Sequence, residues 1–197
     1  MRMPHGKLAA LPRLGRAAIL TATRGVPWQA DGSHRLAQTD SVRWLAEFPN
    51  LVITRTFSKA YGLAGLRVGF GLAHPEVADL MNRARQPFNV SSVAQAAAAA
   101  ALEDCEFVKR SVELNRAGMR QLIEGLEALG LEHIESFANF VTFRAGTAPR
   151  VYQHLLEQGV IVRPIGMYGL PEHLRVTIGL PAENERFLLA LRTALHA

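Results

Sequence analysis

The sequence of 197 residues has only one cysteine, Cys105, and few aromatic residues, which make up 7% of the chain. A single cysteine excludes a disulfide framework and any zinc site built on pairs of cysteines. The histidines are scattered and form no HxxxH pair, so the sequence predicts no metal site. No apolar run reaches the ~20 residues of a membrane-spanning helix, and the N-terminus has no clean apolar core of a signal peptide. These absences favour a protein of the reducing cytoplasm, without a membrane partner.

Acidic residues are scarce only at the start of the chain. The formal net charge is +5, and residues 1–36, with six basic residues against the single acidic residue Asp31, account for all of it. The remaining sequence is balanced in charge and has no basic strand interleaved with aromatic residues, the pattern typical of single-stranded nucleic-acid binding. The sequence therefore does not predict a nucleic-acid partner.

Regular elements are predicted from residue 40 onward, and hydrophobic residues, 49% of the chain, are sufficient for a core. Apolar spacing and turn residues predict helices over 41–48, 75–85, from Ser91 into an alanine run at 96–101, 105–129, 150–158 and 182–195. They predict strands over 50–57, 66–73, 139–143, 160–165 and 174–179. Ser91 or Ser92 can cap the alanine-rich helix, and Gly130 can end the long one. The pattern indicates a small sheet covered by helices.

One stretch, "TFSKAYGLAGLRVGFG", directly follows a predicted strand and combines unusual residue types. Lys59 is preceded by the hydroxyls of Thr56 and Ser58 and followed, eight residues on, by Arg67, with three glycines between residues 62 and 69. A lysine in this position is often only a solvated strand end. Together, however, an amine, two hydroxyls and a guanidinium suit a small phosphorylated aldehyde, since the amine can form a Schiff base while the others bind the phosphate.

The same stretch resembles the cofactor-lysine motif of the fold-type I, pyridoxal-phosphate-dependent aminotransferases, and more narrowly the histidinol-phosphate aminotransferases of class II. The resemblance extends from about Ala37 to the C-terminus. It implies that Lys59 holds pyridoxal 5'-phosphate as a Schiff base and then moves a proton at the substrate, and that Thr56, Ser58 and Arg67 bind the cofactor phosphate. A lysine acting as a base must lose its charge, which burial beside cationic groups favours.

Two later arginines lie in predicted apolar strands: Arg163 in "VIVRPI" and Arg175 in "LRVTIG". Each alone can be a strand-edge residue with its head in solvent, because an unpaired charge is costly inside a protein. The resemblance implies more: Arg175 matches the arginine that holds the substrate α-carboxylate, and Arg163 matches one that helps to bind the phosphate of histidinol phosphate.

The resemblance also implies an α/β, fold-type I architecture. Residues 37–104 would be the last strands of the large cofactor-binding domain, and residues 105–197 a complete α+β small domain. The implied reaction exchanges an amino group between L-histidinol phosphate and 2-oxoglutarate, giving glutamate, in histidine biosynthesis, and the full-length parent would be a homodimer. A related type I aminotransferase, a threonine-phosphate decarboxylase or a catalytically inactive fragment stay open as alternatives.

Residues 1–36 do not fit this family pattern. An aspartate for the cofactor's pyridine nitrogen should lie about thirty residues before the lysine, in a D-E-A-Y-like strand, but the window reads "WQADGSHRLAQ" and Asp31 stands there without the strand. We interpret residues 1–36 as an atypical, poorly patterned segment from a shifted reading frame or a misplaced start. Activity of this chain alone is expected to be impaired.

Overall fold

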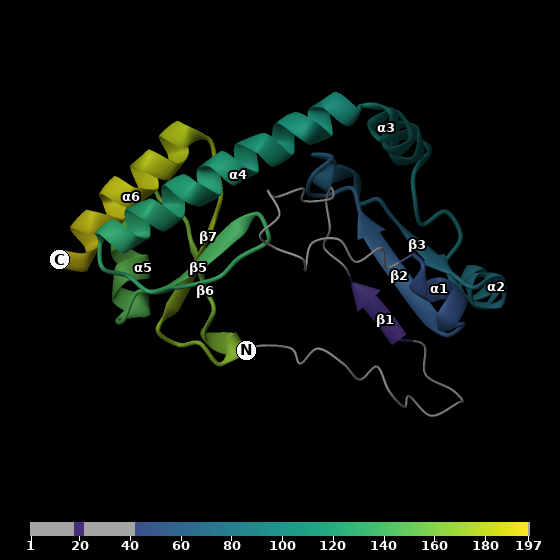
Figure 1. Cartoon of the computed structure of the whole chain (residues 1–197), viewed down its shortest axis with the longest axis horizontal. Helices are drawn as coiled ribbons and strands as arrows, with labels where there is room; N and C mark the ends of the chain where they lie inside the picture. Colours follow the sequence, from purple (N-terminus) through teal and green to yellow (C-terminus); the bar gives the residue numbers. More distant parts are fainter. Residues whose placement is uncertain (1–17, 22–41, 197) are drawn as a thin grey trace. The chain divides into compact units, whose positions relative to one another are not determined.

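A computed structural model of the chain describes residues 42–196, and residues 18–21 as backbone only. The chain divides into two compact units, Met1–Glu103 and Asp104–Ala197 (Figure 1). Apart from 18–21, the atypical segment 1–36 lies outside the described residues, and so does Asp31 within it. The irregularity and the origin proposed for this segment therefore stay predictions. The assignment of the two units to a large and a small domain also stays a prediction.

The first unit contains a three-stranded mixed sheet with the strand order β1-β2-β3. β2 (Leu51–Thr56) forms from the predicted β-branched run, and its first three residues are buried. It pairs parallel with β1 (Ala18–Thr21) and antiparallel with β3 (Gly69–Ala73), where Thr56 lies opposite Gly69. The sequence predicted no strand at β1, because a four-residue run has no readable period and becomes a strand only by pairing with distant residues.

Three helices complete the described part of this unit: α1 (Trp44–Glu47), α2 (Pro75–Ala84) and α3 (Ser92–Glu103). The predicted cap is confirmed, since the Ser91 hydroxyl oxygen accepts a hydrogen bond from the Ala94 amide at 3.2 Å. Close packing of the alanine-rich helix α3 is confined to one stripe, in which Ala94 and Ala98 are buried with Phe57 and Val68. Most of the remaining alanines face away from this cluster and are exposed.

The second unit contains a four-stranded antiparallel sheet with the order β4-β5-β7-β6. Its strands are β4 (His133–Ile134), β5 (Phe140–Arg144), β6 (Arg163–Pro164) and β7 (His173–Thr177). The prediction of a strand over 160–165 was too long: β6 is an edge strand of two residues, and Pro164 has no N–H with which to extend the ladder. The sequence missed β4, which is too short to show an alternating pattern.

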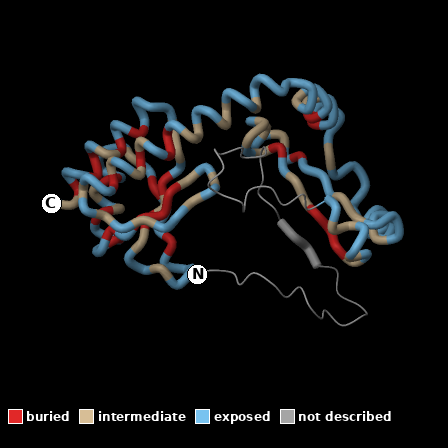
Figure 2. The backbone as a smooth tube through the Cα atoms, viewed as in Figure 1, coloured by how far each residue is buried: buried red, intermediate tan, exposed pale blue. Residues whose placement is uncertain are grey.

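Three helices, α4 (Cys105–Ala128), α5 (Ala148–Glu157) and α6 (Pro181–His196), pack against one face of this sheet. Buried residues gather on the sheet and on the helix faces turned towards it (Figure 2). From the strands, Val141, Phe143, Leu174 and Val176 point into this core, because alternate residues of a strand share a face. The predicted stop of the long helix at Gly130 is confirmed, with the glycine in the left-handed conformation at φ +71°.

A buried amide joins the elements of the second unit. The Asn184 side chain, 2% exposed, donates to Gln121 Oε1 at 3.0 Å and to the Gly179 carbonyl at 3.2 Å, and accepts from the Gly179 amide at 2.9 Å. It thereby connects α4, the turn after β7 and the first turns of α6. No helix among the described residues is long and apolar enough to cross a membrane.

Candidate functional site

The glycine-rich stretch forms a closed turn at the end of β2. The Phe57 amide donates to the Val68 carbonyl at 3.2 Å, and the Leu63 amide donates back to the Phe57 carbonyl at 3.0 Å. At the tip, the Gly62 amide donates to the Lys59 carbonyl at 2.9 Å, with Gly62 at φ +69°. Buried Phe57 and Val68 anchor the base of the turn, so that Lys59 is presented at its tip.

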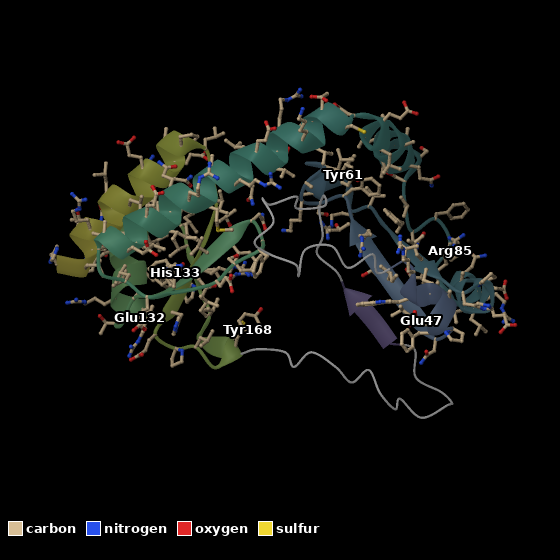
Figure 3. All side chains as sticks on the ribbon, in the orientation of Figure 1. Glu47, Tyr61, Arg85, Glu132, His133 and Tyr168 are labelled. Atoms are coloured by element: carbon tan, nitrogen blue, oxygen red, sulfur yellow. The ribbon has the colours of Figure 1, made fainter. Side chains whose placement is uncertain are left out.

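The turn is stiffened by aromatic packing as well as by hydrogen bonds. The ring of Tyr61, labelled in Figure 3, lies 4.9 Å from the ring of Phe57, and Phe70 of β3 lies 5.8 Å from Phe57 on another side. Aromatic pairs at these centroid distances contribute beyond simple area burial. The backbone that carries Lys59 therefore rests on a fixed apolar base.

Both predicted hydroxyls lie at the start of this turn. The Ser58 amide donates to Thr56 Oγ1 at 3.1 Å, a local turn in which the hydroxyl proton of Thr56 stays available for another acceptor. Thr56 is exposed and Ser58 half-buried. The side chain of Lys59 is also exposed, and within the described residues it forms no hydrogen bond or ion pair. The expected burial of the lysine is therefore not found in this unit, because Lys59 occupies the outer tip of the turn.

Arg67 closes the same turn in an unusual backbone conformation. Its φ is +53°, in the left-handed region that residues other than glycine rarely adopt. Its guanidinium donates to the Ala64 carbonyl at 2.9 Å, which uses one of its five N–H groups. A strained conformation of this kind persists where the surroundings fix it and is frequent at ligand sites. The remaining donors of Arg67 are exposed to a ligand.

The glycines of the turn differ in how strictly the structure requires glycine. At Gly69 an added Cβ would lie 2.6 Å from the Arg55 carbonyl oxygen, so only glycine permits the close crossing of β2 and β3. At Gly65 an added Cβ would meet nothing within 4 Å. A tight turn thus accounts for Gly62 and a close approach for Gly69, but the packing gives no reason for Gly65.

The residues of the turn fit a phosphorylated aldehyde. The turn carries one amine, two hydroxyls and a guanidinium that has donors to spare. It lies at the carboxyl end of β2, which pairs parallel with β1. Open α/β sheets bind their ligands at this edge. Backbone strain at Arg67 points to the same place. Among the described residues there is no cluster of three or more metal-ligating side chains.

Arg163 and Arg175 lie in the second unit, directly opposite each other on the adjacent strands β6 and β7. They are register partners in the β6–β7 pair, and Arg175 is in turn opposite Thr142 of β5. Arg163 is exposed and Arg175 half-buried, with its Cζ 4.6 Å from the centre of the Phe140 ring. Neither arginine has an ion-pair partner in the part of the chain that the structure describes.

Sequence reasoning placed the two arginines in strands but missed Phe140 and Thr142 beside them. The signal was present in "NFVTF", where Phe140 and Thr142 alternate with residues of the core and must share the opposite face. What the pattern could not give is the register that aligns Thr142 with Arg175.

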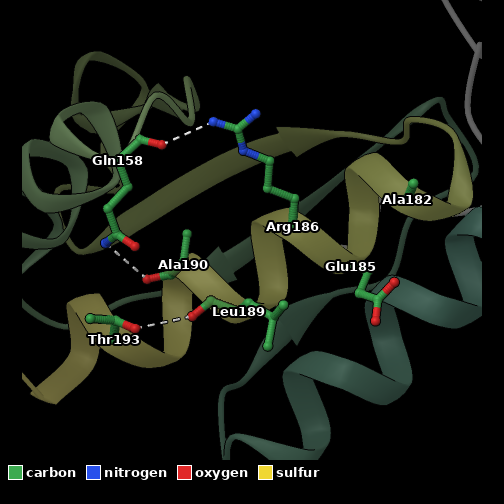
Figure 4. Close-up of a pocket in the computed structure, with 7 residues that line it drawn as sticks. All are labelled: Gln158, Ala182, Glu185, Arg186, Leu189, Ala190 and Thr193. Atoms are coloured by element: carbon green, nitrogen blue, oxygen red, sulfur yellow. Dashed lines mark hydrogen bonds between the residues drawn. The ribbon is translucent and has the colours of Figure 1, made fainter.

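A separate pocket of about 370 Å³ lies between α5 and α6 and contains none of the predicted site residues (Figure 4). Two of its polar side chains join the C-terminal end of α5 to α6. Arg186 Nη2 donates to the Gln158 carbonyl at 3.2 Å, and Gln158 Nε2 donates to the Ala190 carbonyl at 3.4 Å. This pocket is therefore best explained as a helix junction.

The chain has clear similarity to known proteins. A family model described as "Aminotransferase class I and II" matches residues 29–191. A histidinol-phosphate aminotransferase of Dechloromonas aromatica is 66% identical over 158 residues, which cover 80% of this chain and 44% of the relative. The curated relatives are thus more than twice as long as the part of them that this chain spans.

Solved structures agree in fold. A putative histidinol-phosphate aminotransferase from Erwinia carotovora atroseptica superposes with a TM-score of 0.78 at 25% identity, over 89% of this chain and 49% of that one. The Sinorhizobium meliloti histidinol-phosphate aminotransferase was solved in complex with pyridoxal-5'-phosphate. It gives a TM-score of 0.70 at 31% identity, over 75% of this chain and 42% of that one. The α/β structure of this chain therefore matches about half of each of these structures.

Proposed function

Because the chain belongs to the class I and II aminotransferase family, we propose that it carries part of an active site for pyridoxal-phosphate-dependent amino transfer. The observation that carries the proposal is the turn after β2, with Lys59 at its tip and a strained arginine at its end. In this proposal the first unit is the end of a large cofactor-binding domain and the second unit is the small domain.

Four residues of the first unit would hold the cofactor. Lys59 Nζ would bind it covalently, and the hydroxyls of Thr56 and Ser58 and the free donors of Arg67 would bind its phosphate. Bound pyridoxal phosphate supplies an electron sink that weakens the bond between the substrate Cα and its proton. Once substrate displaces it, the Lys59 amine would accept this proton and return it elsewhere, as a general base and acid.

The arginine pair of the second unit would bind the anionic groups of the substrates. Histidinol phosphate carries a phosphate and 2-oxoglutarate carries two carboxylates, and both groups suit the planar fork of a guanidinium. Two arginines opposite each other without a carboxylate partner among the described residues are consistent with an external anion. The identity of 66% to a histidinol-phosphate aminotransferase supports this substrate over other amino donors.

Further parts of the proposal concern the whole protein. A homodimer in the cytoplasm, acting in histidine biosynthesis, is the assembly and setting that the family resemblance implies. The matched relatives extend well beyond the region that this chain covers, so the activity of the chain itself has to be measured rather than transferred.

The cofactor role of Lys59 can be tested by chemical trapping. The chain is incubated with pyridoxal phosphate, reduced with borohydride and digested, and the modified peptides are identified by mass spectrometry. The sequence has three lysines, Lys7, Lys59 and Lys109, which makes the assignment direct. We expect the adduct on Lys59, its loss in Lys59→Ala and its retention in Lys109→Ala. An adduct spread evenly over the lysines, or one that survives in Lys59→Ala, would contradict the cofactor role.

Substrate choice can be tested with a panel of amino donors. Glutamate formation from 2-oxoglutarate is followed with histidinol phosphate, an aromatic amino acid or threonine phosphate, with Lys59→Ala as the blank. We expect histidinol phosphate to be the best donor. Carbon dioxide release from threonine phosphate would favour the decarboxylase alternative, and an adduct on Lys59 without any turnover would favour a fragment that binds the cofactor but does not catalyse.

A further inference from the structure

The sheet of the second unit has a second face, which does not carry the helical core. Val141 and Phe143 of β5 point into the core, so Phe140 and Thr142 lie on the opposite face. On that face Thr142 is next to Arg175, and Arg175 is next to Arg163, in one row across three strands. Thr142 is itself buried, and beside it the row brings two positive charges together on the face that α4, α5 and α6 do not cover.

The charges of this row are unbalanced, in contrast to those of a third arginine of the sheet. Arg144 donates to Glu172 Oε2 at 2.9 Å, and this hydrogen bond, with the attraction between the charges, raises the pKa of the arginine. Arg163 and Arg175 have no such carboxylate among the described residues. Like charges directly opposite on a sheet destabilise the strand pair, and a group that attracts cations would offset this repulsion.

Phe140 supplies one compensating contact. It is the diagonal neighbour of Arg175 on the same face, since Thr142 is opposite Arg175 and Phe140 precedes Thr142 by two residues. The Arg175 Cζ lies 4.6 Å from the centre of its ring. The face of an aromatic ring is negative and attracts a cation, and a stacked guanidinium keeps the N–H groups at its edge free for a planar anion.

The backbone that carries the ring is fixed from several sides. The Ser136 hydroxyl donates to the Phe140 carbonyl at 2.6 Å, and the Ile178 amide donates to the Asn139 carbonyl at 2.9 Å. From α4, Asn115 Nδ2 donates to the Ala138 carbonyl at 3.2 Å. The ring therefore has a defined place from which to orient the arginine.

We propose that Phe140 is a positioning residue, whose ring holds the Arg175 guanidinium beside Arg163 so that the two form one binding site for a doubly charged anion such as a phosphate. The inference rests on the proposed function, in which this pair receives the anionic part of the substrate. It adds a residue that does not contact the anion but sets the orientation of the one that does.

The test compares three replacements at this position in the full chain. Inorganic phosphate is titrated while the Nε–H signals of the arginine side chains are followed by NMR. We expect Phe140→Leu, which keeps apolar bulk but removes the ring, to weaken phosphate binding about three- to tenfold. Phe140→Trp and Phe140→Tyr, which keep an aromatic face, should stay within about twofold of the parent.

Two controls separate positioning from a general loss of structure. Phe107→Leu makes the same change on α4 of the same unit, where the ring is 39% exposed, and should leave phosphate binding unchanged. In an Arg175→Lys background, which lacks the planar group, Phe140→Leu should have less effect than in the parent, because the two residues act through one contact. Equal losses in the leucine and tryptophan variants, additive losses with Arg175→Lys, or no measurable phosphate binding to the parent would each overturn the inference.

Failure of the proposed function would be recognised separately. Phosphate binding to the arginine pair needs neither the cofactor nor turnover, whereas the trapping experiment on Lys59 needs no arginine pair. A missing adduct together with ring-dependent phosphate binding would reject the cofactor proposal and leave the role of Phe140 intact. An adduct on Lys59 together with phosphate binding that does not depend on the ring would support the cofactor proposal and reject the role of Phe140.

Discussion

The two units of the chain differ in how completely they bury their apolar residues. The second unit has one core of sixteen buried residues drawn from its sheet and all three helices. Among the residues of the first unit whose side chains are described, 42–103, a cluster of four buried residues lies under the lysine turn and a separate buried segment lies in β2, while large apolar side chains such as Phe88, 97% exposed, and Val93, 68% exposed, face solvent. The arginine pair is thus carried by a well-packed unit, and the lysine turn by a thinly packed one.

This difference matters because a functional side chain is only as well positioned as the packing beneath it. We expect the second unit to open rarely and as a whole, and the first to open locally and more often.

Truncation of a core ring should affect the two units unequally. Phe143 is fully buried and lies 5.8 Å from the ring of Phe187, so Phe143→Ala should lower the free energy of unfolding of the second unit by about 3–5 kcal/mol. Amide hydrogen exchange of β5 and β7 in urea measures it. The matched change Phe57→Ala, in the first unit, should leave those amides protected. Equal loss of protection there would show that the units do not unfold separately.

A single methyl group should distinguish two glycines of the lysine turn. Gly69→Ala places a Cβ against the Arg55 carbonyl oxygen, a backbone atom that cannot move aside cheaply, and should cost about 1–3 kcal/mol. Gly65→Ala meets open space and should stay within about 0.5 kcal/mol of the parent. Exchange of the β2 and β3 amides and the yield of trapped cofactor on Lys59 are the measurements. If Gly65→Ala lowers only the cofactor yield, that glycine makes room for the ligand.

Loss of the buried amide should loosen the joint between α4 and α6. Asn184→Ala removes a buried side chain and leaves the half-buried Gly179 amide and carbonyl without their partner, for an expected cost of about 1–3 kcal/mol. Urea unfolding followed by circular dichroism would detect it. Thr193→Ala removes an exposed hydroxyl of the same helix that only bonds back to Leu189, and serves as the control. Similar midpoints for both variants would show that the amide contributes little.

The smallest effect is expected at the surface ion pair. The Arg144 and Glu172 side chains are 49% and 51% exposed, so Glu172→Gln should lower the melting temperature only slightly, and less at high salt because the ions screen the attraction. The pair keeps the pKa of Arg144 raised, first through the hydrogen bond that Arg144 donates to Glu172 and then through the attraction between the charges. Because that pKa lies above its ordinary value in the folded chain, the contribution is present at neutral pH and is lost only at strongly alkaline pH. Thermal unfolding at two salt concentrations measures the change, and a large loss that does not depend on salt would mean that the pair acts through more than charge.

The sequence allowed good prediction wherever the signal was local. Ser91 as a helix cap, Gly130 as a helix stop and the buried strand β2 each depend on residues within one turn or one strand, and the structure confirms all three. The stretch around Lys59 was likewise found from its own residues, although the roles assigned there stay predictions. Local signals decide where chemistry-bearing residues stand along the chain.

What could not be predicted depends on contacts between distant residues. β1 exists through its pairing with β2, about thirty residues away, and β6 is shorter than its apolar sequence suggests because it lies at an edge. The alignment of Arg163 with Arg175 and Thr142 follows from the order of the strands, which one sequence does not reveal. The contact between Phe140 and Arg175 was missed for the same reason.

The alignment of two arginines across β6 and β7 also bears on how this unit could be made more robust. Arg163→Glu would turn a repulsive cross-strand pair into an attractive one, and such pairs contribute about 0.2–1 kcal/mol. We expect a higher melting temperature in the absence of phosphate and no phosphate affinity at that position, which a thermal scan with and without phosphate would reveal. If both outcomes are found, the present residues represent a compromise in which the unit gives up some thermostability to keep the proposed anion site charged.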